Sequence, residues 1–82
     1  MNPPDIYYIE YINYRSKYRT VFKTVIYNDY VEETLVYGRL GQSINGRTNQ
    51  LMHDEWIISN YNYNDYSNSN ILTEEDYFLL ML

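Results

Sequence analysis

The feature that most constrains the fold is a run of β-favouring residues over the first forty positions, interrupted by two turn signals. Tyr, Ile, Val, Phe and Thr dominate this run, and the whole chain lacks Ala, the strongest helix former. Asn28-Asp29 suits a two-residue hairpin loop because Asn and Asp tolerate positive φ, and Arg15-Ser16 is a weaker turn candidate. The pattern predicts an antiparallel meander over residues 5–40.

Two-residue loops at both turns define one register for the three predicted strands. This register places Ile9 opposite Phe22, and Phe22 opposite Leu35, on one apolar face. The other predicted rows are Tyr11–Thr20–Tyr37 and Ile26–Val31 on the same face, and Tyr8–Lys23–Thr34 and Glu10–Val21–Val36 on the opposite face. That opposite face is mixed in character, and Gly38 or Gly41 would end or bend the third strand.

The second half of the chain carries weaker signals. Residues 49–59 favour a helix because Asn49 can cap it and two acids follow, although a Trp-Ile-Ile run equally suits a fourth strand. Residues 60–70 contain only Asn, Tyr, Asp and Ser, and they predict a mobile linker. Thr73, as a cap before three acids, predicts a short apolar C-terminal helix within residues 71–82.

The expected fold class is therefore α+β: a small antiparallel β-meander of three to four strands, with one or two short helices in the C-terminal half. Eighty-two residues make one small domain, 1–82, whose core is thin, and no Cys is present to form a disulfide. A thin core favours dimerisation. The apolar end of the chain either docks on its own sheet or inserts into a partner or a second copy.

Charge is distributed unevenly along the chain. Residues 1–49 contain six cations and five acids, whereas residues 50–82 contain six acids and no cation. An acidic segment of this kind repels duplex nucleic acid and is compatible with a partner that has a basic surface. The plainer interpretation is a solvated acidic surface that only aids solubility.

Few combinations of residues in this chain could form a catalytic or metal-binding site. One His and no Cys exclude a Cys–His pair and a thiolate metal site, and His53-Asp54-Glu55 point in different directions on a helix. No Gly-rich phosphate loop occurs. We expect no enzyme activity, no cofactor and no metal.

The leading functional hypothesis is a small acidic protein-binding module, such as an inhibitor that mimics nucleic-acid charge to block the basic groove of a nucleic-acid enzyme. Its acidic and aromatic contact residues would be Asp54, Glu55, Trp56, Tyr61, Tyr63, Asp65, Tyr66, Glu74, Glu75 and Asp76. High Asn, Tyr and Ile content is also typical of AT-rich coding genomes, as in many viruses and mobile elements.

Two alternatives belong to other classes. One is a self-associating structural or assembly subunit. The other is a binder of single-stranded nucleic acid that stacks bases on tyrosines interleaved with cations. The face for this second alternative would be Tyr8, Tyr14, Lys17, Arg19 and Lys23.

The predicted compartment is the cytoplasm, that of a host cell if the protein is viral. The N-terminus shows no basic region followed by an apolar run, so no secretory signal is expected. The longest apolar stretch, residues 77–82, is too short to span a bilayer, and no membrane association is expected.

Overall fold

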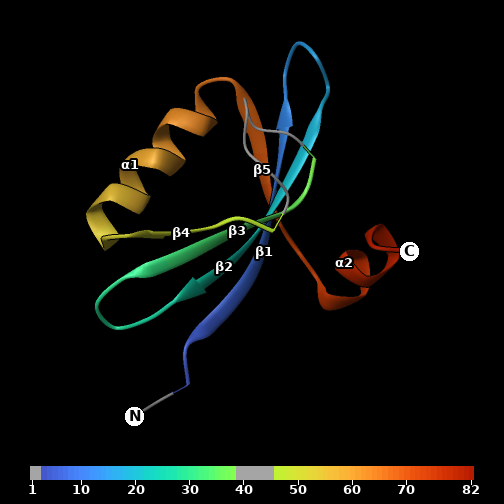
Figure 1. Ribbon diagram of the computed structural model, residues 1–82. Helices are drawn as coiled ribbons and strands as arrows, with labels where there is room; N and C mark the ends of the chain where they lie inside the picture. Colours follow the sequence, from blue (N-terminus) through green and yellow to red (C-terminus); the bar gives the residue numbers. More distant parts are fainter. Residues whose placement is uncertain (1–2, 39–45) are drawn as a thin grey trace.

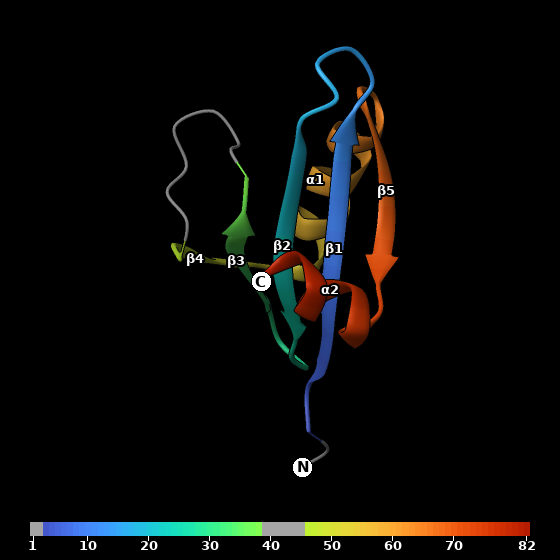
Figure 2. The ribbon, with the colours of Figure 1, turned by 90° about the vertical axis from the view of Figure 1, so that its right-hand side faces the viewer.

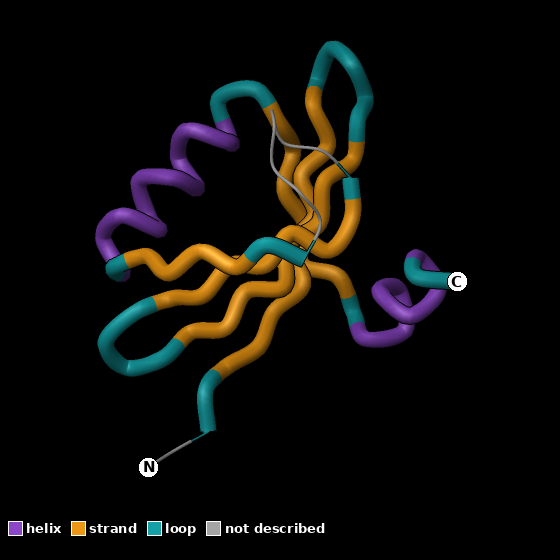
Figure 3. The backbone as a smooth tube through the Cα atoms, viewed as in Figure 1, coloured by secondary structure: helices purple, strands orange, loops and turns teal. Residues whose placement is uncertain are grey.

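The computed structural model describes residues 3–38 and 46–82. Its elements in chain order are β1 (Asp5–Asn13), β2 (Arg19–Ile26), β3 (Val31–Tyr37), β4 (Thr48–Leu51), α1 (His53–Asn64), β5 (Ser67–Leu72) and α2 (Glu74–Leu80). The five strands form one antiparallel sheet in the order β4-β3-β2-β1-β5. The α+β class with a small antiparallel meander is confirmed (Figure 3), and β5 extends the meander by pairing with the free side of β1 (Figure 2).

The two helices lie on opposite sides of the sheet (Figures 1 and 2). We call the two sheet surfaces the α1 face, where Tyr63 of α1 contacts Tyr11, and the α2 face, where Tyr77 of α2 stacks on Tyr8. The α1 segment connects β4 at one edge of the sheet to β5 at the other, so it must cross the sheet. Neither helix in the described ranges has the length and apolar character needed to cross a membrane.

Most of the hydrophobic core lies on the α1 face, while Val21, paired with Glu10, is buried on the α2 face. Tyr11, Phe22 and Leu35 form its buried cluster, and the half-buried Ile9 and Tyr63 pack against it. The Tyr63 ring centroid lies 4.8 Å from that of Tyr11 and 6.1 Å from that of Phe22, which are ordinary separations for paired aromatic rings. The thin core expected from chain length is therefore completed by one helix side chain.

Most of the predicted register is confirmed. Ile9, Phe22 and Leu35 form one row, and the pairs Tyr11–Thr20, Tyr8–Lys23, Lys23–Thr34 and Ile26–Val31 are also present. The row that joined Thr20 to Tyr37 is wrong, because an irregularity between Val21 and Phe22 places Tyr37 opposite Val21. The predicted Val21–Val36 pair is lost for the same reason.

Gly38 explains why the strand is irregular there. Its φ is +90°, and a Cβ at this position would lie 2.1 Å from the carbonyl oxygen of Arg19. Only Gly permits this close approach of two backbones. Residues 39 and 40, which the sequence assigned to the meander, and Gly41 lie outside the described residues.

The two turns differ in length. Tyr27 N donates to Tyr30 O at 2.9 Å, which confirms the two-residue loop at Asn28-Asp29. The first turn is longer than predicted, because Asn13 N donates to Tyr18 O and encloses four residues, 14–17. The Asn13 side chain stabilises this turn by accepting from two backbone N–H groups within it. The loop 14–17 is one residue longer on each side than the predicted loop Arg15-Ser16, so the pairing of β1 with β2 is the same.

The structure resolves the ambiguity of residues 49–59 and corrects the expected linker. Asn49 lies in β4, and the helix begins only at His53, without a side-chain cap. Residues 60–70, expected to be mobile, instead form the last turns of α1 and most of β5. The physical reason is that strand pairing uses backbone groups, so an Asn/Ser segment can join a sheet that a preceding strand already offers.

The C-terminal helix forms as predicted at its start. Thr73 is the N-cap, and its Oγ1 accepts from Asp76 N at 3.1 Å. The Tyr77 ring stacks on Tyr8 with 3.8 Å between centroids, so the segment contacts its own sheet. The remaining apolar side chains of this segment are mostly exposed: Phe78, Leu79, Met81 and Leu82.

Candidate functional site

A hollow of about 400 Å³ lies between α1 and β5 on the α1 face, and we call it the α1–β5 cleft. Its lining residues are Ile9, Tyr11, Trp56, Asn60, Asn64, Ser69, Asn70 and Ile71. In Figure 1, α1 and β5 border this side of the sheet. The volume falls in the range of small ligand pockets, but the cleft opens at the edge of the sheet.

Local geometry explains which side chains line the cleft. Trp56, Asn60 and Asn64 are spaced by four residues, so they form one stripe of α1. Ser69 and Ile71 pair with Tyr11 and Ile9, and therefore share their α1 face. The cleft is thus formed by a helical stripe and by every second residue of an edge strand.

Two polar groups in the cleft behave differently. The Tyr11 hydroxyl donates a hydrogen bond to Asn60 Oδ1, which ties β1 to the middle of α1. The indole Nε1 of Trp56 is buried and has no acceptor among the described residues. A buried donor left without an acceptor costs roughly 1–3 kcal/mol. The helix stripe that borders the cleft therefore contains one buried donor without an acceptor among the described residues.

A buried carboxyl belongs to the same face of the sheet. Glu33 is only 6 % exposed as a residue, and burial raises the pKa of its carboxyl to about 7. Thr24 lies opposite Glu33 in the register, and its buried Oγ1 has no partner among the described residues. Burial, followed by the charges of Glu33 and Tyr63, raises the pKa of the Tyr11 phenol. Near neutral pH, Glu33 is therefore the group on this face whose charge changes.

The outer edge of β5 is open. Tyr14 N donates to Tyr66 O at 2.9 Å, and these residues follow the same register as β1 and β5. Because bonded pairs alternate along an antiparallel ladder, Asn68, Asn70 and Leu72 direct their backbone groups toward β1. The backbone groups of Ser67, Ser69 and Ile71 therefore point away from β1. No described strand pairs with them (Figure 2).

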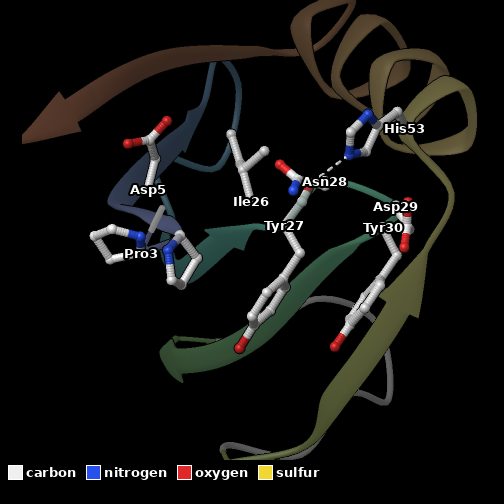
Figure 4. Close-up of a pocket in the computed structure, with 9 residues that line it drawn as sticks. Pro3, Asp5, Ile26, Tyr27, Asn28, Asp29, Tyr30 and His53 are labelled. Atoms are coloured by element: carbon white, nitrogen blue, oxygen red, sulfur yellow. Dashed lines mark hydrogen bonds between the residues drawn. The ribbon is translucent and has the colours of Figure 1, made fainter. Parts of the chain in front are cut away.

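A second hollow, of about 570 Å³, lies at the β2–β3 hairpin (Figure 4). Tyr27 and Tyr30 stack with 4.7 Å between ring centroids, and Figure 4 shows both rings pointing the same way, with His53 at the opposite end. His53 Nε2 lies 2.8 Å from Tyr27 O, which anchors the start of α1 to the hairpin. Burial, with the nearby Glu32, raises the pKa of the Tyr27 phenol.

The chemistry of this hairpin hollow is limited. Two further carboxylates, Asp5 and Asp29, also line it. Within residues 3–38 and 46–82, no group of three or more His, Asp or Glu side chains is placed to hold a metal ion. Since His53 is used to hold the hairpin, the hollow offers an aromatic contact surface.

The predicted acidic and aromatic residues do not form one surface. Asp54 and Glu55 begin α1, and Asp65 ends it, on one side of the sheet. Glu74, Glu75 and Asp76 begin α2 on the other side (Figure 1). Of the predicted aromatic contacts, Trp56 and Tyr63 are half-buried toward the sheet, whereas Tyr61 and Tyr66 are exposed.

The alternative nucleic-acid residues lie on the α2 face and in the first turn. One side of the Tyr8 ring is occupied by Tyr77. Arg19 is ion-paired, with its Nε 2.5 Å from Oε2 of the buried Glu10. Lys23 lies in the same row as Tyr8, while Tyr14 and Lys17 are exposed in or beside the turn. α2 and Glu10 therefore already engage two of the five residues.

Sequence reasoning missed the α1–β5 cleft because it treated residues 60–70 as a linker. Asn60, Ser69 and Ile71 become site residues only once β5 pairs with β1. A signal was present: Ser67-Asn-Ser-Asn-Ile-Leu72 contains no Gly, Pro or charge that would oppose a strand. Comparison with protein-family models, curated proteins and solved structures finds no match for this chain.

Proposed function

We propose that this protein is a non-catalytic, acidic protein-binding module whose partner presents a basic surface with apolar contact groups. The observation that carries the proposal is a coincidence of two properties in residues 50–82. This segment has six acids and no cation, and it also contains most of the large exposed apolar side chains. They are Met52, Ile57, Ile58, Tyr61, Tyr66, Ile71, Phe78, Leu79, Met81 and Leu82.

Both α1 and α2, on opposite sides of the sheet, carry exposed apolar side chains, and such groups are typical of contact surfaces. Tyr61 is 72 % exposed and Phe78 is 65 % exposed, so both rings are available for burial by another molecule. Aromatic anchors surrounded by charge resemble the composition of protein interfaces. The acids around them favour a partner rich in Lys and Arg.

The position of the acids bears on the kind of partner. They lie at the starts of two helices on opposite sides of the sheet, so they do not follow one continuous stripe like the phosphates of a duplex. We therefore propose local contacts with a basic protein surface. Inhibition of a nucleic-acid enzyme stays within this proposal, as one example of a partner with a basic groove.

Self-association is the second candidate function. One observation favours it. Tyr77 of α2 stacks on Tyr8 of the sheet, but the apolar residues that follow it in the chain are exposed: Phe78, Leu79, Met81 and Leu82. A second copy could bury this group. Like charges in the same segment oppose such an assembly, and added salt should strengthen it.

The test has two parts. Sedimentation of the pure protein across a wide concentration range separates a monomer from a self-associating species. Immobilised protein is then compared with a Glu74→Gln, Glu75→Gln variant and with a Phe78→Ser variant for capture of proteins from a lysate, and captured partners are purified for titration.

The proposal expects a monomer and a basic partner that both variants bind more weakly. A concentration-dependent dimer without such a partner would favour self-association. Capture of acidic and basic proteins alike, unaffected by either variant, would refute the proposal.

A further inference from the structure

We propose that the open edge of β5 accepts an extended segment of the partner as an added strand, with one of its side chains entering the α1–β5 cleft and with basic residues flanking it. This inference rests on the proposed function and deepens it, because it names the surface and the form of the partner segment. It joins three observations: an unpaired strand edge, a cleft beside it, and carboxylates next to its end.

The edge is suited to strand addition. β5 pairs with β1 without interruption over Ser67–Leu72, so its outer side presents regularly spaced groups. The segment contains no Pro, no Gly and no charged side chain, which are the features that usually protect a sheet edge. The backbone N–H and C=O groups of Ser69 and Ile71 would bond to the added strand. Each such bond is worth roughly 0.5–1.5 kcal/mol net.

The cleft supplies a position for a side chain. Residues of an added strand beside Ser69 or Ile71 share their α1 face, so one of these side chains points into the α1–β5 cleft. It would cover Ile71, which is 66 % exposed, and it would pack beside Trp56, which lines the cleft.

The negative charge beyond the Leu72 end of β5 indicates what kind of segment would bind at this edge. Glu74 and Glu75 follow β5 by two and three residues, both are exposed, and residues 48–82 contain no cation to neutralise them. A second copy pairing antiparallel through the same edge would bring the Ser67 end of its β5 toward these carboxylates, where Asp65 partly offsets the nearby cations Arg15 and Lys17. A partner segment with Lys or Arg at this end gains attraction instead.

The two ends of the β5 edge differ in charge. At the Ser67 end, Asp65 lies near the first turn, whose Tyr14 bonds to Tyr66 and which contains the cations Arg15 and Lys17. These cations reduce the net negative charge there. The preference for a basic residue is therefore set at the Leu72 end, by Glu74 and Glu75.

The other sheet edge fits such a segment less well. β4 has four residues, Thr48–Leu51, and it begins directly after the cation Arg47. β5 has six paired residues and lies beside the cleft. The inference therefore concerns β5 alone.

The probe is a synthetic peptide of about ten residues, with alternating Val and Thr flanked by two Lys at each end, matched by a peptide with Glu in place of Lys. Trp56 is the one Trp of the chain, so its fluorescence reports directly on the cleft. Amide hydrogen exchange by NMR gives the second readout. Binding at the edge slows exchange at Ser69 and Ile71 and leaves the amides already bonded to β1 unchanged.

Two changes each remove backbone hydrogen-bond donors between β5 and the added strand, one in the protein and one in the peptide. Ser69→Pro deletes an N–H that points away from β1, and Ser69→Thr keeps that N–H as the matched control. An N-methylated version of the Lys peptide removes the peptide N–H groups that would donate to the outward C=O groups of β5, with the protein unaltered, so the test stands even if the Pro variant unfolds. We expect Ser69→Pro or peptide methylation to weaken binding at least about tenfold, equivalent to ~1.4 kcal/mol.

The outcomes separate this inference from the proposed function. Slow exchange at Ser69 and Ile71 with the Lys peptide, lost on N-methylation, supports the inference. Lys-peptide binding that shifts α2 amides and ignores N-methylation overturns it while leaving a basic partner in place. Equal binding of the Lys and Glu peptides at the edge overturns the basic occupant of this edge, whereas the proposed function falls only if capture is also indifferent to charge and to both variants.

Two further outcomes would overturn the inference. One is the absence of binding to the folded protein at millimolar peptide. The other is concentration-dependent protection of Ser69 and Ile71 without peptide, which would show that a second copy occupies the edge.

Discussion

Replacing Glu33 with Gln should change how stability depends on pH. Glu33 is 6 % exposed as a residue, and burial raises the pKa of its carboxyl from 4.5 to about 7 in the folded protein. A raised pKa means that the folded state holds the proton more tightly than the unfolded state. The native protein therefore loses stability as pH rises from about 4.5 to about 7, because the carboxyl ionises first in the unfolded chain.

The size of the effect follows from the two pKa values. A difference of about 2.5 units corresponds to roughly 3 kcal/mol, at about 1.36 kcal/mol per unit. Gln keeps the shape of the protonated acid and does not ionise. Near pH 4 the two proteins should thus have similar unfolding free energies, and near pH 8 the Glu33→Gln variant should be more stable by ~2–3 kcal/mol.

Urea unfolding, followed by far-UV circular dichroism at several pH values, measures this difference. The other carboxyls titrate in both proteins, so subtracting one curve from the other isolates Glu33. The comparison near pH 4 is the internal control for packing. A difference that stays constant between pH 4 and pH 8 would refute the reasoning. So would a directly measured Glu33 pKa, by carboxyl carbon NMR, near its ordinary value.

Three further predictions concern the core, a turn and a cap. Phe22→Ala removes the middle ring of the buried row and should cost ~3–5 kcal/mol in urea unfolding; a loss below 1 kcal/mol would contradict its central place. Gly38→Ala should lower the melting temperature because its Cβ would clash with Arg19 O, and an unchanged melting temperature would show that the backbone relaxes freely. Thr73→Ala removes the bond to Asp76 N and should cost about 1 kcal/mol, seen as faster amide exchange within α2, whereas Thr73→Ser should retain it.

The predicted part of the fold is the part governed by local pattern. Ile9, Phe22 and Leu35 align because side-chain alternation and a short Asn28-Asp29 turn leave one register that buries all three. Thr73 caps α2 for an equally local reason. The error at Tyr37 arose because a close approach between Gly38 and Arg19 is a contact between two strands that no single strand encodes.

The candidate site depended on long-range pairing. Trp56, Tyr61 and Glu74 could be named from composition, but the α1–β5 cleft and the open edge exist only because β5 returns to pair with β1. Ser and Asn have weak intrinsic strand preference, so their conformation is set by the backbone partner that is available.

Neighbouring residues and composition are enough to specify the meander, its apolar row, the capped start of the last helix and the cation-free acidic half. Long-range contacts instead make residues 67–72 a strand, divide the acids between two sides of the sheet, and bury Glu33 and the Nε1 of Trp56. The physical reason is that burial and strand pairing are set by groups distant in the chain, whose contacts form only when the whole sheet is assembled.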